Sequence, residues 1–186
     1  MSNDRNRICP VELANSLDSR FRRWLQDPRK LLANYLHEGM TVLDIGCGPG
    51  FFSLEMARMV GTSGRVVAAD LQEGMLQKLR DKIKGTELED RIILVKCDQD
   101  KTNVSERFDF VLAFFMVHEV PDKNSFFQQM KGVLKENGQF LMVEPKLFHV
   151  SRREFGVTTT LAEDNGFKIH QGPKLPLSWS AILKNA

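Results

Sequence analysis

A chain of 186 residues is long enough for one domain with a full hydrophobic core, and 42% hydrophobic with 27% charged residues is an ordinary globular composition. The formal net charge of +2 is too small to indicate nucleic-acid binding, and no apolar run approaches the roughly 18 residues of a membrane span. The first residues lead into no signal-peptide core. Three scattered cysteines fit neither a zinc site nor a disulfide framework, and the four histidines show no metal spacing. We therefore expect a cytoplasmic protein without a metal.

Two helices are predicted ahead of the first strand. Pro10 can open the first, in which apolar residues recur at helical spacing as far as Trp24. Asp27 and Pro28 have the residue types of an N-cap and a first helical position, and this second helix is expected to run to about His37. Residues 1–38 could form a lid over a ligand site or a packing layer at the sheet edge, and both hypotheses stay open.

The most informative stretch is the heptad Asp44-Ile45-Gly46-Cys47-Gly48-Pro49-Gly50, between a predicted strand (40–45) and a predicted helix (51–60). Glycines permit positive φ and let a ligand approach the backbone closely. A turn of this kind, at the carboxyl end of the first strand of an α/β sheet, binds nucleotide-like ligands. Gly50 comes one residue too early for the dinucleotide fingerprint, and Asp44 would repel a pyrophosphate. These two features argue against a nicotinamide-dependent reductase and favour a ligand with a positive group.

This heptad resembles motif I of the class I S-adenosylmethionine-dependent methyltransferases. The resemblance implies S-adenosylmethionine as cofactor, with S-adenosylhomocysteine as product. It also implies cofactor contacts from the residues of the turn, namely Asp44, Gly46, Cys47, Gly48 and Gly50. Cys47 could be a reactive thiol or a small residue that fills the turn.

Two later acids complete the predicted cofactor site. Asp70 ends the predicted strand 65–70 and can accept hydrogen bonds from both ribose hydroxyls, or it can serve as a helix N-cap. Leu71 and Met75, around the start of a helix predicted over 73–84, are expected to contact the adenine or ribose. Asp98 follows the strand 91–96, and the resemblance implies that it binds the exocyclic amine of adenine; the alternative is a solvated turn acid.

The candidate catalytic residues follow the fourth and fifth strands. The run 108–115 is predicted to be a buried strand, with backbone of Phe114 near the cofactor, and His118 follows it. After a helix over 124–134, Asn137-Gly138 is expected to turn into a strand (139–143) that ends at Glu144. His118 could accept a proton near neutral pH, and Glu119 and Glu144 are further candidates near these strand ends; the alternative for His118 is a structural role.

The remaining elements define the fold. A capping-box pattern at Ser151 starts a helix that ends at Asn165-Gly166, and two strands (167–170 and 178–183) close the chain. The short link between them requires an antiparallel last strand. We predict an α/β fold, a Rossmann-like seven-stranded mostly parallel sheet with helices on both faces, and the resemblance implies strand order 3-2-1-4-5-7-6. Residues 1–186 form a single domain, with 39–186 as cofactor-binding core.

The predicted function is methyl transfer to a small, partly apolar acceptor. The walls of the acceptor pocket are expected from residues 1–38, from 114–120 and from Phe148-His149. A cofactor-binding sensor or partner subunit without turnover stays open as an alternative. The arginines around the first helix could contact RNA, although one basic helix face is typical of a solvated surface. The sequence does not indicate an oligomeric state.

Overall fold

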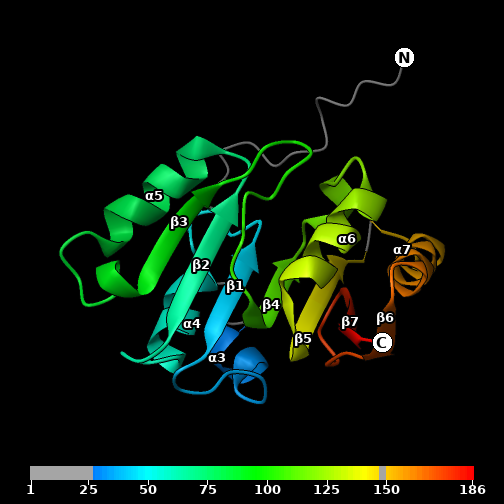
Figure 1. Cartoon of the computed structure of the whole chain (residues 1–186), viewed down its shortest axis with the longest axis horizontal. Helices are drawn as coiled ribbons and strands as arrows, with labels where there is room; N and C mark the ends of the chain where they lie inside the picture. Colours follow the sequence, from blue (N-terminus) through cyan, green and yellow to red (C-terminus); the bar gives the residue numbers. More distant parts are fainter. Residues whose placement is uncertain (1–26, 147–149) are drawn as a thin grey trace.

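The computed structural model describes residues 27–146 and 150–186, and its centre is one seven-stranded sheet (Figure 1). The strand order is β3-β2-β1-β4-β5-β7-β6, as predicted. The strands are β1 (Thr41–Ile45), β2 (Arg65–Asp70), β3 (Ile92–Lys96), β4 (Phe108–Phe114), β5 (Leu134–Pro145), β6 (Phe167–Gln171) and β7 (Ser178–Asn185). β1 to β5 pair in parallel, and β7 pairs antiparallel with both β5 and β6. The predicted reversal of the last strand is confirmed.

Helices cover both faces of the sheet, as predicted. They are α3 (Pro28–Leu32), α4 (Ser53–Met59), α5 (Glu73–Ile83), α6 (Lys123–Val133) and α7 (Arg152–Asp164), with short 3₁₀ turns η3 (Glu89–Arg91) and η4 (Val117–Glu119). The sheet separates two hydrophobic clusters, because successive strand residues point to opposite faces. α3, α4 and α5 contribute to one cluster, and α6 and α7 contribute to the other. No helix in the two described ranges is long and apolar enough to cross a bilayer.

The helix ends carry the predicted caps. The Asp27 carboxylate accepts bonds from the Arg29 and Lys30 amides, at 3.1 and 3.2 Å. Ser151 and Glu154 form a complete capping box. The helix α3 is shorter than predicted, since it ends at Leu32 rather than near His37.

The predicted turn at Asn137-Gly138 is wrong, because both residues lie within β5. The strand instead carries an irregularity, where Phe108 pairs with Leu134 but Phe110 pairs with Gln139. A Cβ on Gly138 would lie 2.9 Å from the Phe108 carbonyl oxygen. The glycine that suggested a turn therefore serves a close backbone approach at a bulge.

The described part of the N-terminal segment packs against the sheet. Leu31, Leu32 and Leu36 are buried in the same cluster as Phe52 and Met56, and α3 contacts α4. This agrees with the packing hypothesis for residues 27–38. The first predicted helix, and with it the lid hypothesis for residues 1–26, lies outside the described residues.

Replacing Leu32 should test whether this segment belongs to the core. Leu32 is fully buried, so Leu32→Ala should lower the free energy of unfolding by about 2–5 kcal/mol. The exposed neighbour Lys30 provides the control, and Lys30→Ala should change that free energy by no more than about 0.5 kcal/mol. Urea unfolding followed by circular dichroism measures both, and equal losses in the two variants would contradict the assignment.

Candidate active site

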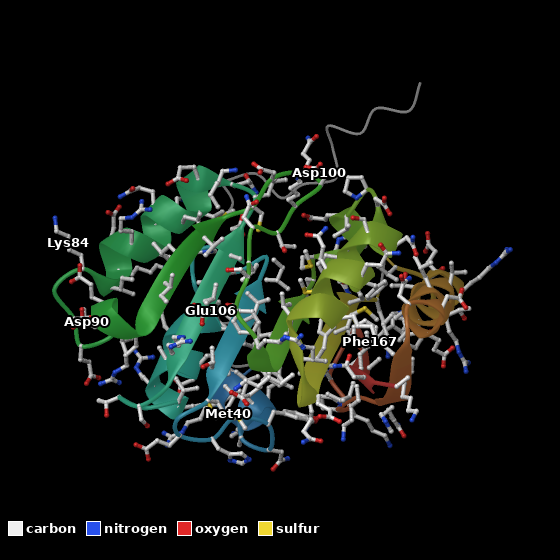
Figure 2. All side chains as sticks on the ribbon, viewed as in Figure 1. Met40, Lys84, Asp90, Asp100, Glu106 and Phe167 are labelled. Carbon is white, nitrogen blue, oxygen red and sulfur yellow. The ribbon has the colours of Figure 1, made fainter. Side chains whose placement is uncertain are left out.

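The carboxyl ends of the parallel strands meet at one edge of the sheet, around a cavity of about 460 Å³. Asp100 lies at this edge, whereas Met40 and Asp90 lie at the opposite one (Figure 2). The lining comes from the segments after β1, β2, β3 and β4 and from the start of α6. Every predicted cofactor-site residue except Gly50 contributes to it: Asp44, Gly46, Cys47, Gly48, Asp70, Leu71, Met75, Asp98 and Phe114. The predicted wall at residues 27–38 is wrong, because none of these residues lines the cavity, and the predicted walls at residues 1–26 and 148–149 lie outside the described residues.

The glycines of the turn have different roles. Gly46, Gly48 and Gly50 all have positive φ, at 73°, 54° and 87°. A Cβ on Gly46 would lie 2.8 Å from the Met116 side chain, and one on Gly50 would overlap Leu79. A Cβ on Gly48 would meet no atom within 4 Å. Gly46 and Gly50 therefore permit close packing, and Gly48 is where the backbone is open to a ligand.

Asp70 binds the turn directly. Its Oδ2 accepts the Gly48 N–H at 2.8 Å and its Oδ1 accepts the Gln72 N–H at 2.8 Å. Each oxygen keeps a second lone pair, so the carboxylate can still accept two hydroxyl donors from a sugar. Burial raises the pKa of Asp70, although these backbone bonds and Lys96 oppose the shift. Asp70 is not the N-cap of α5, because that position is Gln72, and no side chain caps the helix there. The role of Asp70 as an acceptor for a ligand stays a prediction.

The cavity is strongly acidic. The Asp44 carboxylate is 2% exposed and accepts the Ser53 hydroxyl at 2.5 Å. Among the described lining residues the acids are Asp44, Asp70, Asp98, Asp100, Glu119 and Asp122, and the base is Lys101. Such a field favours a cationic ligand and disfavours phosphate.

Two cysteines face this cavity as buried thiols. Burial, with Asp44 and Asp70 nearby, raises the pKa of Cys47 well above its ordinary value. Burial likewise raises the pKa of Cys97, to about 12. A thiol with a raised pKa is a poor nucleophile at neutral pH. This favours the hypothesis that Cys47 is a small residue that fills space in the turn, over a reactive thiol.

Asp98 lies in a tight loop at the mouth of the cavity. Its backbone N–H donates to the Lys101 carbonyl at 2.8 Å, and its Oδ2 accepts the Asn103 side-chain amide at 3.0 Å. Asn103 has a positive φ of 55°. No local pattern indicates Asn103, because its partners Lys96 and Asp98 are set by the folded conformation of the loop.

The end of β4 carries a strained residue that sequence reasoning missed. Phe115 has φ 60°, a region that non-glycine residues seldom adopt and that costs on the order of 1 kcal/mol. Its N–H donates to the Val143 carbonyl at 2.8 Å, while Phe114 packs on Phe52 with ring centroids 4.5 Å apart. The bend carries the chain from β4 to Met116, whose side chain packs beside Gly46.

The two candidate catalytic residues contact each other. The Glu144 carboxylate is 2% exposed and accepts the backbone N–H groups of Val117 and His118, at 3.0 and 3.1 Å. His118 Nδ1 lies 2.7 Å from Glu144 Oε2. The lining of the cavity includes neither of them but does include Glu119, whose Oε1 lies 3.9 Å from His118 Nε2. Glu119, a further candidate near these strand ends, is therefore the one of the three acidic and histidine candidates that lines the cavity.

The described residues contain no cluster of side chains that could hold a metal ion. The arrangement instead suits an uncharged sugar with two hydroxyls, together with a neighbouring positive group. The carboxylates of Asp70 and Asp44 and the open backbone at Gly48 match these two requirements.

Comparison with known proteins gives a family match. The model of a family described as "Methyltransferase domain" matches residues 36–174. The ubiquinone/menaquinone biosynthesis C-methyltransferase UbiE of Haemophilus ducreyi is 34% identical over 110 residues, which cover 59% of this chain and 42% of that protein. The demethylmenaquinone methyltransferase of Listeria welshimeri is 30% identical over 122 residues, 66% of this chain and 51% of that protein. The chain thus spans about half the length of the curated relatives it matches.

Solved structures share the fold over nearly the whole chain. A SAM-dependent methyltransferase from Aquifex aeolicus superposes with a TM-score of 0.84 at 25% identity, covering 95% of this chain and 98% of that one. A TehB-like SAM-dependent methyltransferase from Corynebacterium glutamicum superposes with a TM-score of 0.73 at 15% identity, covering 95% and 100%. The second likeness concerns the fold alone.

The buried thiols generate a prediction about reactivity. In a Cys9→Ser background, Cys47 and Cys97 should react with iodoacetamide at pH 8 at least about 100-fold more slowly in the folded chain than in guanidinium. Their raised pKa values leave little thiolate while the chain is folded, and unfolding restores the ordinary value. Mass spectrometry of the two peptides measures the rates. Comparable labelling before and after unfolding would contradict the buried environment.

Proposed function

Because the chain belongs to the S-adenosylmethionine-dependent methyltransferases, we propose that it transfers a methyl group from that cofactor to a small acceptor molecule. The observation that carries the proposal is the pairing of Asp70 with the Gly48 amide at the open point of the glycine turn. The Asp70 carboxylate can accept bonds from ribose hydroxyls, and the open backbone at Gly48 lets a nucleoside approach it. Bound there, the cofactor supplies a methyl group already activated by a positive sulfur.

The residues around the turn are assigned to parts of the cofactor. Asp70 accepts the ribose hydroxyls, and Asp44 lies on the side of the positive groups. Asp98 accepts the exocyclic amine of adenine. Leu71 and Met75 give apolar contact, and the cofactor also contacts the turn at Gly46, Cys47 and Gly48 and the backbone of Phe114. Gly50 acts through packing on α5. These assignments are supported by the shared cavity lining and by its excess of carboxylates.

We propose a small and partly apolar acceptor. The curated relatives are named for steps in ubiquinone and menaquinone biosynthesis. Away from the cofactor turn, the cavity lining includes the apolar residues Val120, Pro121 and Phe126. The acidic field disfavours a polyanion such as nucleic acid. A cytoplasmic location is part of the proposal and is supported by the free thiols of Cys47 and Cys97.

His118 and Glu144 are proposed to assist proton removal when the acceptor starts out protonated. The Glu144 carboxylate fixes both the backbone and the ring of His118. An Nδ1–H donated to Glu144 leaves Nε2 as the acceptor nitrogen, on the side of Glu119. The protein's other contribution is alignment, because holding donor and nucleophile about 3–3.5 Å apart can lower the barrier by several kcal/mol.

The alternative function is cofactor binding without turnover, as a sensor or a partner subunit. Incubation with cofactor labelled in the methyl group, together with a panel of quinols and other small phenols, separates the two. Label transfer supports the enzyme, and tight binding of S-adenosylhomocysteine without transfer to any compound favours the sensor.

Removing the Asp70 carboxylate should weaken cofactor binding. Asp70→Ala should lower the affinity for S-adenosylhomocysteine by about 10- to 100-fold, since hydrogen bonds to a charged acceptor contribute about 1.5–3 kcal/mol. Isothermal titration calorimetry measures the change. Asp90→Ala, an exposed aspartate at the opposite sheet edge, is the matched control and should bind normally. Unchanged binding in Asp70→Ala would remove the ribose assignment.

Loss of the His118 imidazole should slow transfer to a protonated acceptor. His118→Ala should lower kcat by about 100-fold, the usual contribution of a general base. It should also flatten the acid limb of the pH–rate profile, which a purely structural residue would not affect. His170→Ala, an exposed histidine on β6, serves as control. A variant with normal turnover and an unaltered profile would take His118 out of the mechanism.

A further inference from the structure

The loop after β3 is fastened to α6 by one side chain, that of Gln129. Its Oε1 accepts the backbone N–H and the hydroxyl of Thr102, at 2.9 and 3.1 Å. Its Nε2 donates to the Asp100 carbonyl at 2.9 Å and to the Ser125 hydroxyl at 3.2 Å. Both acceptor positions and both donor protons of this amide are therefore engaged.

Asn103 closes the other end of the same loop. Its side-chain amide donates to the Lys96 carbonyl at 2.9 Å and to the Asp98 carboxylate at 3.0 Å. The positive φ of Asn103 allows the chain to turn back toward β4, a conformation that asparagine tolerates better than most residues. The Asp98 carboxylate is thereby held from one side by a neutral donor.

These polar contacts are what give the loop a defined position. Residues 98–101 are exposed, and only Thr102 among residues 98–102 is buried. An exposed segment with little apolar burial opens at low free energy unless specific bonds hold it. Gln129 and Asn103 supply such bonds to the loop after β3, on either side of Asp98.

The loop and the helix also belong to the same cavity. Residues 98–102 line it from one side, and Ser125, Phe126 and Gln129 line it from α6. The loop lines the part of the cavity assigned to adenine, and α6 borders the part assigned to the acceptor. Gln129 therefore links these two parts of the cavity wall.

We infer that Gln129 and Asn103 are positioning residues for adenine recognition, which hold the Asp98 carboxylate where it accepts the exocyclic amine of the base. The inference rests on the proposed function. On this inference, Asp98, Gln129 and Asn103 together make the site prefer a base with an amino group over one with an oxo group. Of the three, Asp98 alone is assigned a contact with the ligand. Neither Gln129 nor Asn103 takes part in the transfer itself.

The test compares two ligands that differ at one position of the base. S-adenosylhomocysteine carries the exocyclic amine, and S-inosylhomocysteine carries an oxygen there. The unmodified chain should bind the first at least about tenfold more tightly, because an oxygen facing the Asp98 carboxylate cannot donate. Gln129→Leu and Asn103→Gly should each reduce this preference at least about threefold, and calorimetry measures all the affinities. Glycine is chosen at position 103 because it removes the side-chain amide and adopts the positive φ without strain.

The matched control is Gln128→Leu, an exposed glutamine of the same helix that should leave the preference unchanged. Loss of affinity for both ligands in equal proportion would overturn the inference, since that is the result of a merely structural role. An unmodified chain that binds both ligands equally would overturn it too, while Asp70→Ala could still support the ribose assignment. A chain that binds neither ligand would contradict the proposed function, and the inference with it.

If either Gln129→Leu or Asn103→Gly does not fold, the remaining variant still tests the preference between the two ligands. A measurement without ligand supports both: hydrogen exchange at the Thr102 amide should be at least about tenfold faster in Gln129→Leu than in Gln128→Leu, because that amide donates to Gln129. Equal protection in the two variants would contradict the role of Gln129.

Discussion

The hydrogen bond from the Gly48 amide to the Asp70 carboxylate is the interaction on which the site depends. It joins the turn after β1 to the end of β2, two segments that are neighbours in the sheet but 22 residues apart in the chain. Burial raises the pKa of Asp70 and so opposes its charge, while hydrogen bonds from backbone donors and the nearby Lys96 act in the opposite direction. The protein thus retains an anion in a partly dehydrated position, where a ligand with hydroxyl donors can bind it.

The acidic cavity accounts for the selectivity of the proposed cofactor site. Asp44 and Asp70 are both nearly buried, and the glycine turn between them opens at Gly48. A pyrophosphate would meet like charge here, whereas a sulfonium and an ammonium would be attracted. A glycine-rich turn binds phosphates in other α/β proteins, and the carboxylates beside this one support the proposal that it binds a positively charged nucleoside instead.

The side of the cavity proposed for the acceptor is formed by the chain that follows β4. The strained Phe115 turns the backbone, Glu144 binds the amides of Val117 and His118, and Glu119 then faces the cavity. On the other side, Gln129 ties α6 to the loop that carries Asp98. Buried or fully bonded polar groups thus fix the two sides of the cavity, the segment after β4 and the loop after β3. This agrees with a reaction that depends mainly on the alignment of donor and acceptor.

The sequence by itself determined the alternation of strands and helices, the glycine turn and the acids Asp70 and Asp98, since these are local patterns, and the resemblance to a known family implied the strand order that the structure confirms. It misplaced a turn at Gly138, because a glycine that permits a bulge looks the same as one that permits a turn. Only the tertiary structure decided that Gln129 binds the Asp98 loop and that Glu144 holds His118. Those contacts join residues 26 to 29 positions apart, and no local spacing encodes a partner that the folded sheet and helix bring into reach.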